Sequence, residues 1–477
     1  MNQNSNSLPS KNHKSGLSLQ QVIGWAFILG LALVSALMIF AGLGKILNLA
    51  FPTAALGVGV FLYFRYPLLY IGFTWWLWFL TPFIRRISDY HSTFTDPSPI
   101  LLAPFLVTFV SSITLWRNLP KLYQQGGFPY ILSLLAVLYG FLVGLINRSP
   151  VTVGIALLDW LCPIVFGVHI FINWKFYLSY RKSIQRIFLW GIIVMGLYGI
   201  IQFLVAPEWD IYWVIKSEFA SAGKLEPLGL NVWSTMASNQ PFGTVMTAGL
   251  LLLLVNPNKG KLAAPATGLG YLSFLLARKR TTWASWLFGL LLLAGSLKSS
   301  LQIRIIIAMA LTAFCVVPLV TLEPFSNFLS DRFTTITELQ GDTSAEARQE
   351  TYSELIDDAF NSYLGKGIGG PPHDSGILSS LLDLGWFGTF CYFSGILILL
   401  LSLFQGAEIR TDPFVNAACA IAISTLIQLP LSRPHVEVQG MVLWGFMSLA
   451  MAAQKYHQFN QKIKNMYSLE AFYSNYH

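Results

Sequence analysis

Long apolar segments follow one another along almost the whole of this chain, and they constrain its fold more than any motif does. The hydrocarbon core of a bilayer is about 30 Å thick, and a helix needs about 20 mostly apolar residues to cross it. The candidate segments lie near residues 22–42, 46–64, 68–84, 100–116, 128–146, 151–171, 187–205, 242–255, 261–277, 283–297, 303–322, 384–404, 412–431 and 437–453. We therefore predict an all-α polytopic membrane protein with about 12–14 transmembrane helices.

The composition excludes the main alternatives. Of the 477 residues, 54% are hydrophobic and only 11% are charged, whereas a soluble domain carries about 25% charged residues. A soluble enzyme, a disordered chain and a disulfide-stapled secreted module are therefore excluded. The net charge of +8 is scattered between apolar segments, which is typical of headgroup anchors and does not indicate nucleic acid as a partner. All four cysteines lie within apolar segments, so we expect neither disulfides nor a zinc site.

The polar segments give the expected topology. Residues 1–21 are polar and lead into an apolar run that is too long for a signal-peptide core, so we expect an uncleaved first span. Lysines and arginines show a modest excess on the side of this tail, which places both termini in the cytoplasm. The predicted order is a cytoplasmic tail (1–21), transmembrane helices with an outer loop at 206–241 (22–322), a large outer loop (323–375), C-terminal transmembrane helices (376–453) and a cytoplasmic tail (454–477).

The large outer loop is the place where we expect chemistry, because it holds ten of the 22 acidic residues. Thr343 and Glu346 have capping-box spacing, and apolar residues from Tyr352 to Tyr363 recur at helical spacing, which predicts an amphipathic helix. Arg348 falls on the apolar face of that helix, where a guanidinium requires an anionic partner. A carboxylate of the loop and an anionic ligand both remain open.

The helix ends at the glycine-rich stretch 365–370, which is followed by His373 and Asp374. Such a stretch can cradle a phosphate with backbone N–H groups, or it can simply end the helix. A histidine that titrates near neutrality can take a proton from a sugar hydroxyl, although many outer-loop histidines have no such role. Asp374 is the alternative base, or it orients the imidazole.

Three further polar features are candidates for a functional role. The cations at 278–280 lie at the outer end of a span, either as headgroup anchors or as ligands for a diphosphate. Asp159 lies within the span 151–171, where a carboxylate is a functional candidate. Asp89 is an outer carboxylate that a metal-dependent transferase could use.

Several stretches together resemble the O-antigen ligase and polymerase family of bacterial envelope glycan enzymes. They are residues 231–243 (NVWSTMASNQPFG), 280–283 (RTTW), 331–335 (DRFTT), 342–348 (DTSAEAR), 365–369 (GKGIG), 373–378 (HDSGIL) and 384–388 (LGWFG). The resemblance implies a GT-C-like membrane glycosyltransferase in the bacterial plasma membrane, with no cofactor and no metal. Two positions depart from the family pattern: Asn231 replaces an arginine, and Asp374 replaces an asparagine.

By this resemblance, His373 would activate the acceptor hydroxyl, with Asp374 beside it, and arginines would bind the donor diphosphate: Arg280, Arg348 and Arg332. The donor would be a glycan on undecaprenyl diphosphate, and the acceptor a second glycan or a lipid. We thus expect an envelope polysaccharide polymerase or ligase, with membrane lipids as further partners. The alternative is a lipid-linked glycan flippase, which should show repeat-related halves and more charge along its central spans than this sequence does.

Overall fold

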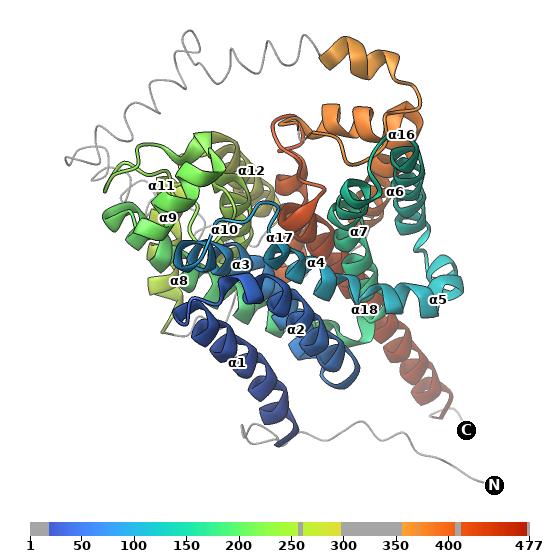
Figure 1. The fold of residues 1–477 in the computed structure, drawn as a ribbon. Coiled ribbons are helices and arrows are strands. Elements are labelled where there is room, and N and C mark those ends of the chain that lie inside the picture. Colours follow the sequence, from blue (N-terminus) through green and yellow to red (C-terminus); the bar gives the residue numbers. More distant parts are fainter. Residues whose placement is uncertain (1–18, 256–260, 297–354, 372, 406–411, 475–477) are drawn as a thin grey trace.

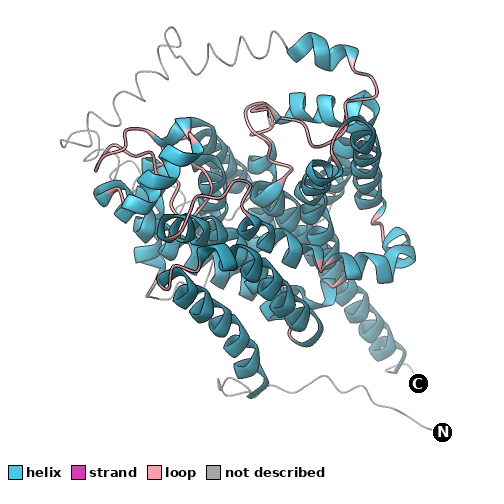
Figure 2. Cartoon of the chain, viewed as in Figure 1, coloured by secondary structure: helices cyan, strands magenta, loops and turns pink. Residues whose placement is uncertain are grey.

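The computed structural model describes residues 19–255, 261–296, 355–371, 373–405 and 412–474. Their regular structure is helical apart from one isolated β-bridge between Gly223 and Leu230 (Figure 2). The α-helices are α1 (Leu19–Phe40), α2 (Gly44–Arg65), α3 (Pro67–His91), α4 (Leu102–Phe109), α5 (Ser112–Gln124), α6 (Phe128–Asn147), α7 (Pro150–Ile172), α8 (Tyr177–Val205), α9 (Glu208–Ser217), α10 (Asn239–Val255), α11 (Ala263–Leu276), α12 (Arg280–Ser296), α16 (Gly376–Phe404), α17 (Pro413–Leu426) and α18 (Glu437–Ser474). Short 3₁₀ helices are η1 (Pro99–Leu101), η2 (Trp174–Phe176) and η3 (Ala220–Ala222).

Within the described residues, eight helical segments are long and apolar enough to cross a membrane, which is the pattern of a multi-pass membrane protein. They are α1, α2, α3, the run from η1 to α5, α6, α7, the run from η2 to α8, and α16, and α10, α11 and α17 are shorter apolar helices. Each predicted segment in the described part of the chain overlaps a helix, whereas segment 303–322 lies outside it.

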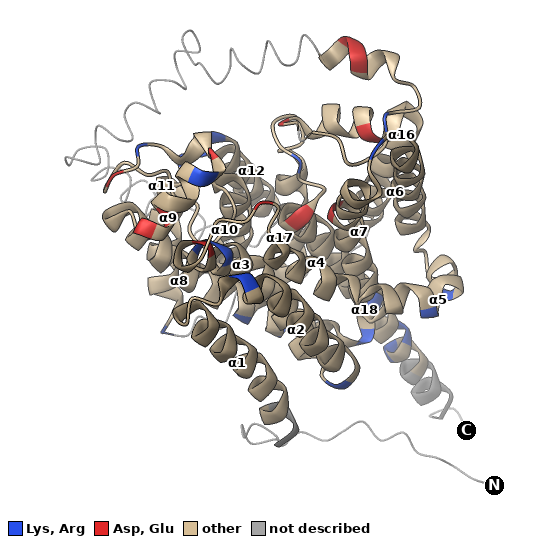
Figure 3. Ribbon diagram, viewed as in Figure 1, with Lys and Arg blue, Asp and Glu red and all other residues tan. Residues whose placement is uncertain are grey.

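The helix α1 begins, and α18 ends, on the same side of the bundle (Figure 1). We call this side the terminal face and the opposite side the cavity face. Lysines and arginines gather at the terminal face, whereas the cavity face mixes both signs (Figure 3). The described cations of the terminal face are Arg65, Arg117, Lys121, Lys175, Arg181, Lys182, Arg186, Lys261, Lys455, Lys462 and Lys464, and its described acidic residues are Asp412 and Glu470.

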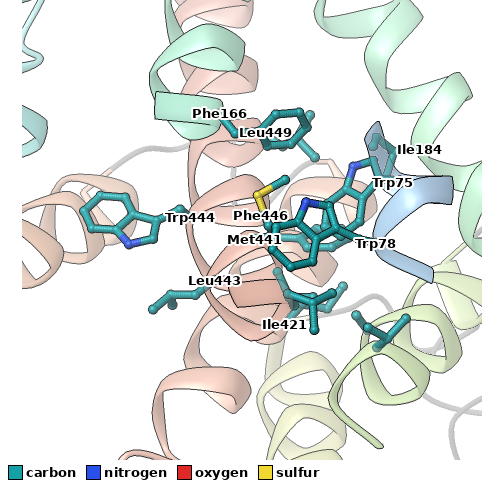
Figure 4. Packing of buried hydrophobic residues seen from close by; sticks show 14 of the residues in the cluster. Trp75, Trp78, Phe166, Ile184, Ile421, Met441, Leu443, Trp444, Phe446 and Leu449 are labelled. Atoms are coloured by element: carbon teal, nitrogen blue, oxygen red, sulfur yellow. The ribbon is translucent and has the colours of Figure 1, made fainter. Parts of the chain in front are cut away.

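The first half of α18 forms the centre of the core. Met441, Trp444 and Phe446 are fully buried. Side chains from α3, α7, α8 and α17 lie around Met441 and Phe446, whereas Trp444 points away from them (Figure 4) and contacts Tyr130 of α6 and Tyr392 of α16. Lipid chains are as apolar as these residues, so close packing rather than removal from water holds such helices together. Edge-to-face ring contacts, such as Phe446 on Phe188 at 5.3 Å, are part of that packing.

Residues 206–241, predicted as an outer loop, pack against the bundle and contain α9. Trp213 and Trp233 are buried in a small core of their own. They surround the buried guanidinium of Arg86, whose carbon lies 6.0 and 5.8 Å from the two ring centroids.

Two helix ends also differ from the prediction. The helix α18 continues through the expected tail to Ser474, since its second half is rich in helix-forming Gln and Lys. The span expected at 384–404 begins earlier, at Gly376, and is kinked at Gly385, which has a φ of +67°. Of the predicted amphipathic helix, residues 355–361 are described and helical. Leu355 and Ala359 pack against Leu378, Leu381 and Leu382 of α16, so this part of the predicted apolar stripe faces the bundle.

Candidate functional site

A polar cavity of about 330 Å³ opens at the cavity face, between the N-terminal ends of α10, α16 and α18. Its wall comes from segments far apart in the sequence, namely 219–221, 237–241, Lys279, 373–374 and 431–439. Both residues predicted to be catalytic, His373 and Asp374, line it. Arg280 is half-buried at the start of α12, next to the lining residue Lys279. Arg348 and Arg332 lie outside the described residues.

The glycine-rich stretch leads to His373 at this cavity, and two of its N–H groups are bonded within the protein. Gly367 has a φ of +81°, and a β-carbon there would overlap the backbone nitrogen of Gly144 in α6. The N–H of Lys366 donates to the carbonyl of Leu382 (2.6 Å), and that of Ile368 donates to Gly140 (3.0 Å). These N–H groups are therefore not available to a phosphate. Through these contacts, the stretch connects α6 to α16.

Substituting Gly367 with alanine should destabilise the protein by about 2 kcal/mol or more, because it adds a clash with α6 to a left-handed backbone. Gly126 is the matched control: its φ is +80°, but a β-carbon there meets nothing within 4 Å. We expect thermal unfolding in detergent to begin at a clearly lower temperature for Gly367→Ala than for Gly126→Ala. Equal unfolding temperatures would show that the contact with Gly144 is not tight.

The surroundings of His373 favour its neutral form. Partial burial lowers the pKa of its imidazole below the ordinary value, and the positive charges of Arg433 and Arg148 lower it further. The nearby Asp374 carboxylate opposes this shift. A neutral imidazole at pH 7 can accept a proton, which a protonated one cannot do.

Hydrogen bonds at the start of α16 hold His373 and Asp374 next to Arg433. The N–H of Gly376 donates to the carbonyls of Leu429 (2.9 Å) and Ser432 (3.0 Å), in the connection between α17 and α18. Arg433 follows Ser432 directly and lines the cavity. Lys279 lines it too, so two cations face a space that also holds a neutral histidine.

A network of amide and hydroxyl side chains lies along the cavity floor. Gln240 and Gln439 line the cavity, and Nε2 of Gln240 donates to Oε1 of Gln428 (2.7 Å). Nε2 of Gln439 donates to the Thr244 hydroxyl (3.1 Å). The Thr281 hydroxyl donates to Oε1 of Gln240 (2.7 Å), which ties the start of α12 to the cavity wall.

A buried ion pair fixes the segment that leads into the wall at residues 237–241. Nε of Arg86 lies 3.2 Å from Oδ1 of Asp210, and both side chains are almost completely buried. Arg86 also donates to the carbonyl of Ser234, a residue held at a φ of +52°. The Gln202 amide donates to Asp210 (2.7 Å), and its oxygen accepts from the N–H of Ser234 (2.8 Å). The cavity wall therefore depends on α3, α8 and α9.

An apolar groove of about 380 Å³ adjoins the polar cavity. Pro, Leu, Phe and Trp side chains of α3, η1 and α4 form half of its lining. Glu437 and Ala237 belong to both spaces, so the groove and the cavity meet at these two residues. Asp159 of α7, the intramembrane candidate, also lines the groove. Asp89 lines neither space and pairs with Arg85 at 3.3 Å.

The sequence did not predict that Arg433 and Glu437 would join the site. One feature of the sequence could have indicated Arg433. It is a cation between two spans on the predicted outer side, where the positive-inside rule disfavours cations. No such feature indicated Glu437, since its position depends on a left-handed φ of +51° at the start of α18. Strain of this kind in a non-glycine residue is common at functional sites.

Neither a protein-family model nor a curated protein matches this sequence. The chemistry of the cavity and the groove is therefore the basis for a function.

Proposed function

We propose that this protein is a membrane glycosyltransferase of the O-antigen polymerase or ligase type. It would transfer a glycan from a polyprenyl-diphosphate donor to a hydroxyl group of an acceptor glycan or lipid. The observation that carries the proposal is the junction of an apolar groove with a cation-lined polar cavity at Glu437 and Ala237. A polyprenyl diphosphate has the same two parts, an apolar chain and an anionic head that carries sugars.

The sequence resemblance supports the same proposal. Two of its stretches line one cavity, through residues 237–241 and through His373 and Asp374, and a third stretch, 280–283, directly follows the lining residue Lys279. A GT-C-like arrangement, in which a lipid-linked donor enters from the bilayer, belongs to this proposal. We assign Lys279 and Arg433 to the diphosphate, together with Arg280, Arg348 and Arg332.

The reaction needs one base and a stabilised leaving group. The proton of the acceptor hydroxyl moves to the neutral imidazole of His373, and the acceptor oxygen forms a bond to the anomeric carbon of the donor. The bond from that carbon to the diphosphate breaks, and the diphosphate leaves with the electron pair. Fixed cations such as Lys279 and Arg433 stabilise the charge on the leaving group. In-line attack inverts the anomeric centre.

The charge distribution supports a location in the bacterial plasma membrane with the terminal face in the cytoplasm. Among the described residues of the terminal face, cations far outnumber acidic residues, as in cytoplasmic loops of membrane proteins. The cavity would then open on the outer side, where envelope glycans are assembled.

The decisive experiment incubates purified, lipid-reconstituted protein with a polyprenyl-diphosphate oligosaccharide and separates the products by size. A ladder of products, lost in Lys279→Gln/Arg433→Gln, indicates a polymerase that uses this cavity. A single product that forms only after an acceptor lipid or glycan is added indicates a ligase. Movement of the intact donor across the membrane without any glycan transfer would overturn the proposal in favour of a flippase.

The pH dependence of transfer tests the role of His373. Because burial and nearby cations lower its pKa, the wild-type rate should stay level down to about pH 6.5, the ordinary pKa of histidine, and fall only below it. Arg433→Gln removes a cation that lowers this pKa, so the acid limb of its profile should move to higher pH. Each profile is scaled to its own maximum, and Lys462→Gln on the terminal face serves as the control. An acid limb that Arg433→Gln leaves in place would contradict the assignment.

A further inference from the structure

The helix α5 has 13 residues, is polar in part and lies at the margin of the bundle (Figure 1). It follows α4 after a bend at Val110 and Ser111, and it leads into α6. Arg117, Asn118 and Lys121 interrupt its apolar residues. Such a composition suits the headgroup region, at the end of the candidate span that runs from η1 to α5.

One side of α5 is fixed to the bundle. The Thr114 hydroxyl forms hydrogen bonds with Nδ1 of His169 and with the hydroxyl of Tyr63, both at 2.7 Å. Leu122, two turns further along, is completely buried. These contacts fix the rotation of the helix about its axis, and so they determine which residues point away from the protein.

The side that points away has an apolar part and a basic part. Trp116, Leu119 and Tyr123 are three and four residues apart, so they share one face, and Trp116 is 85% exposed. Arg117 and Lys121 are four residues apart and form the adjoining basic stripe. Both are exposed, and within the described residues neither forms an ion pair.

The charge around α5 indicates what covers this side. Lys455 of α18 lies at its C-terminal end and donates to the side-chain oxygen of Gln125 (3.3 Å). Asp412, the acidic residue of this face whose side chain is described, is bonded to Arg181 (3.1 Å) and to the Tyr177 hydroxyl (3.0 Å). The basic stripe and the nearby Lys455 therefore form a region of excess positive charge, which the described part of the protein does not neutralise.

We propose that α5 is a binding site for an anionic phospholipid, with the lipid phosphate at Arg117 and Lys121 and the acyl chains against Trp116, Leu119 and Tyr123. A planar guanidinium and a lysine ammonium are the usual protein ligands of phosphate. The exposed tryptophan and tyrosine suit the boundary between headgroups and acyl chains. A zwitterionic lipid offers the same phosphate with no net charge, so it would not neutralise the stripe. This site is independent of the proposed glycan transfer.

The test measures lipid retention by the full-length protein. Purified protein is equilibrated with an equimolar mixture of phosphatidylglycerol and phosphatidylcholine, and the bound lipids are counted by native mass spectrometry. We expect wild-type protein to retain phosphatidylglycerol preferentially. Arg117→Gln/Lys121→Gln should reduce that preference by about tenfold. The matched control is Lys462→Gln/Lys464→Gln, which removes the same charge from exposed positions of the same face and should keep the preference.

A second measurement keeps the test valid if the double variant folds poorly. The fluorescence of Trp116 is obtained as the difference between wild type and Trp116→Phe. Phosphatidylglycerol with brominated acyl chains should quench it more strongly than phosphatidylcholine with brominated acyl chains does. Equal quenching by the two lipids would overturn the proposal. An equal loss of preference in both double variants would also overturn it, since it would show a diffuse effect of surface charge.

Discussion

Replacing His373 with glutamine should lower the rate of glycan transfer by about 10² to 10⁴-fold, the range that a positioned general base contributes. Glutamine keeps a polar side chain of similar length but cannot take up the proton of the acceptor hydroxyl. The cations that we assign to the diphosphate, Lys279 and Arg433, stay in place. Binding of the donor should therefore change little, and single-turnover rates at saturating donor would isolate the loss to the chemical step.

The companion variant Asp374→Asn decides between the two neighbouring side chains. Asp374 is exposed, whereas His373 is partly buried beside Arg433 and Arg148. We expect Asp374→Asn to lower the rate much less, and to move the acid limb of the pH profile to lower pH, because its negative charge raises the pKa of His373. A large loss in Asp374→Asn together with a small loss in His373→Gln would make Asp374 the base.

The membrane-spanning pattern could be predicted because the thickness of a bilayer sets a minimum length for each apolar helix. For the same reason, the prediction was weakest where a helix is not limited by the bilayer, as in the second half of α18. His373 and Asp374 could be singled out because they combine titratable chemistry with a position next to a span. Bringing them to Arg433 depends on hydrogen bonds between Gly376 and the connection from α17 to α18, which no local pattern contains.

The segment 206–241 shows most clearly what local sequence leaves out. A tryptophan in a loop between spans has the same pattern whether it faces lipid or packs inward. Trp213 and Trp233 pack inward because they surround Arg86, and Arg86 bonds to Ser234 across 148 positions of the sequence. The glycines at 365–370 have a similar ambiguity, because no local pattern indicates that Gly367 lies against the backbone of α6.

Replacing Arg86 with methionine should destabilise the protein by about 3–5 kcal/mol, because it leaves the carboxylate of Asp210 buried without its cation. The side chains of Arg86 and Asp210 are 1% and 0% exposed, so water cannot compensate for the loss. Ser234 would lose the hydrogen bond that Arg86 donates, and the cavity wall at 237–241 would shift. We therefore expect transfer activity to fall together with stability, although Arg86 does not line the cavity.

The double variant Arg86→Met/Asp210→Asn separates the cost of a lone buried charge from the loss of the pair itself. Asparagine can still accept hydrogen bonds from Tyr198 and Gln202, which both donate to Asp210 at 2.7 Å, and it carries no charge. The free energy of unfolding of the double variant, measured in mixed detergent and denaturant, should thus lie well above that of Arg86→Met. If the double variant regained stability but not activity, the guanidinium would be needed to place the segment at Ser234. If Arg86→Met alone cost less than about 1 kcal/mol, the ion pair would be no more than a surface pair in strength, and the cavity wall would not depend on it.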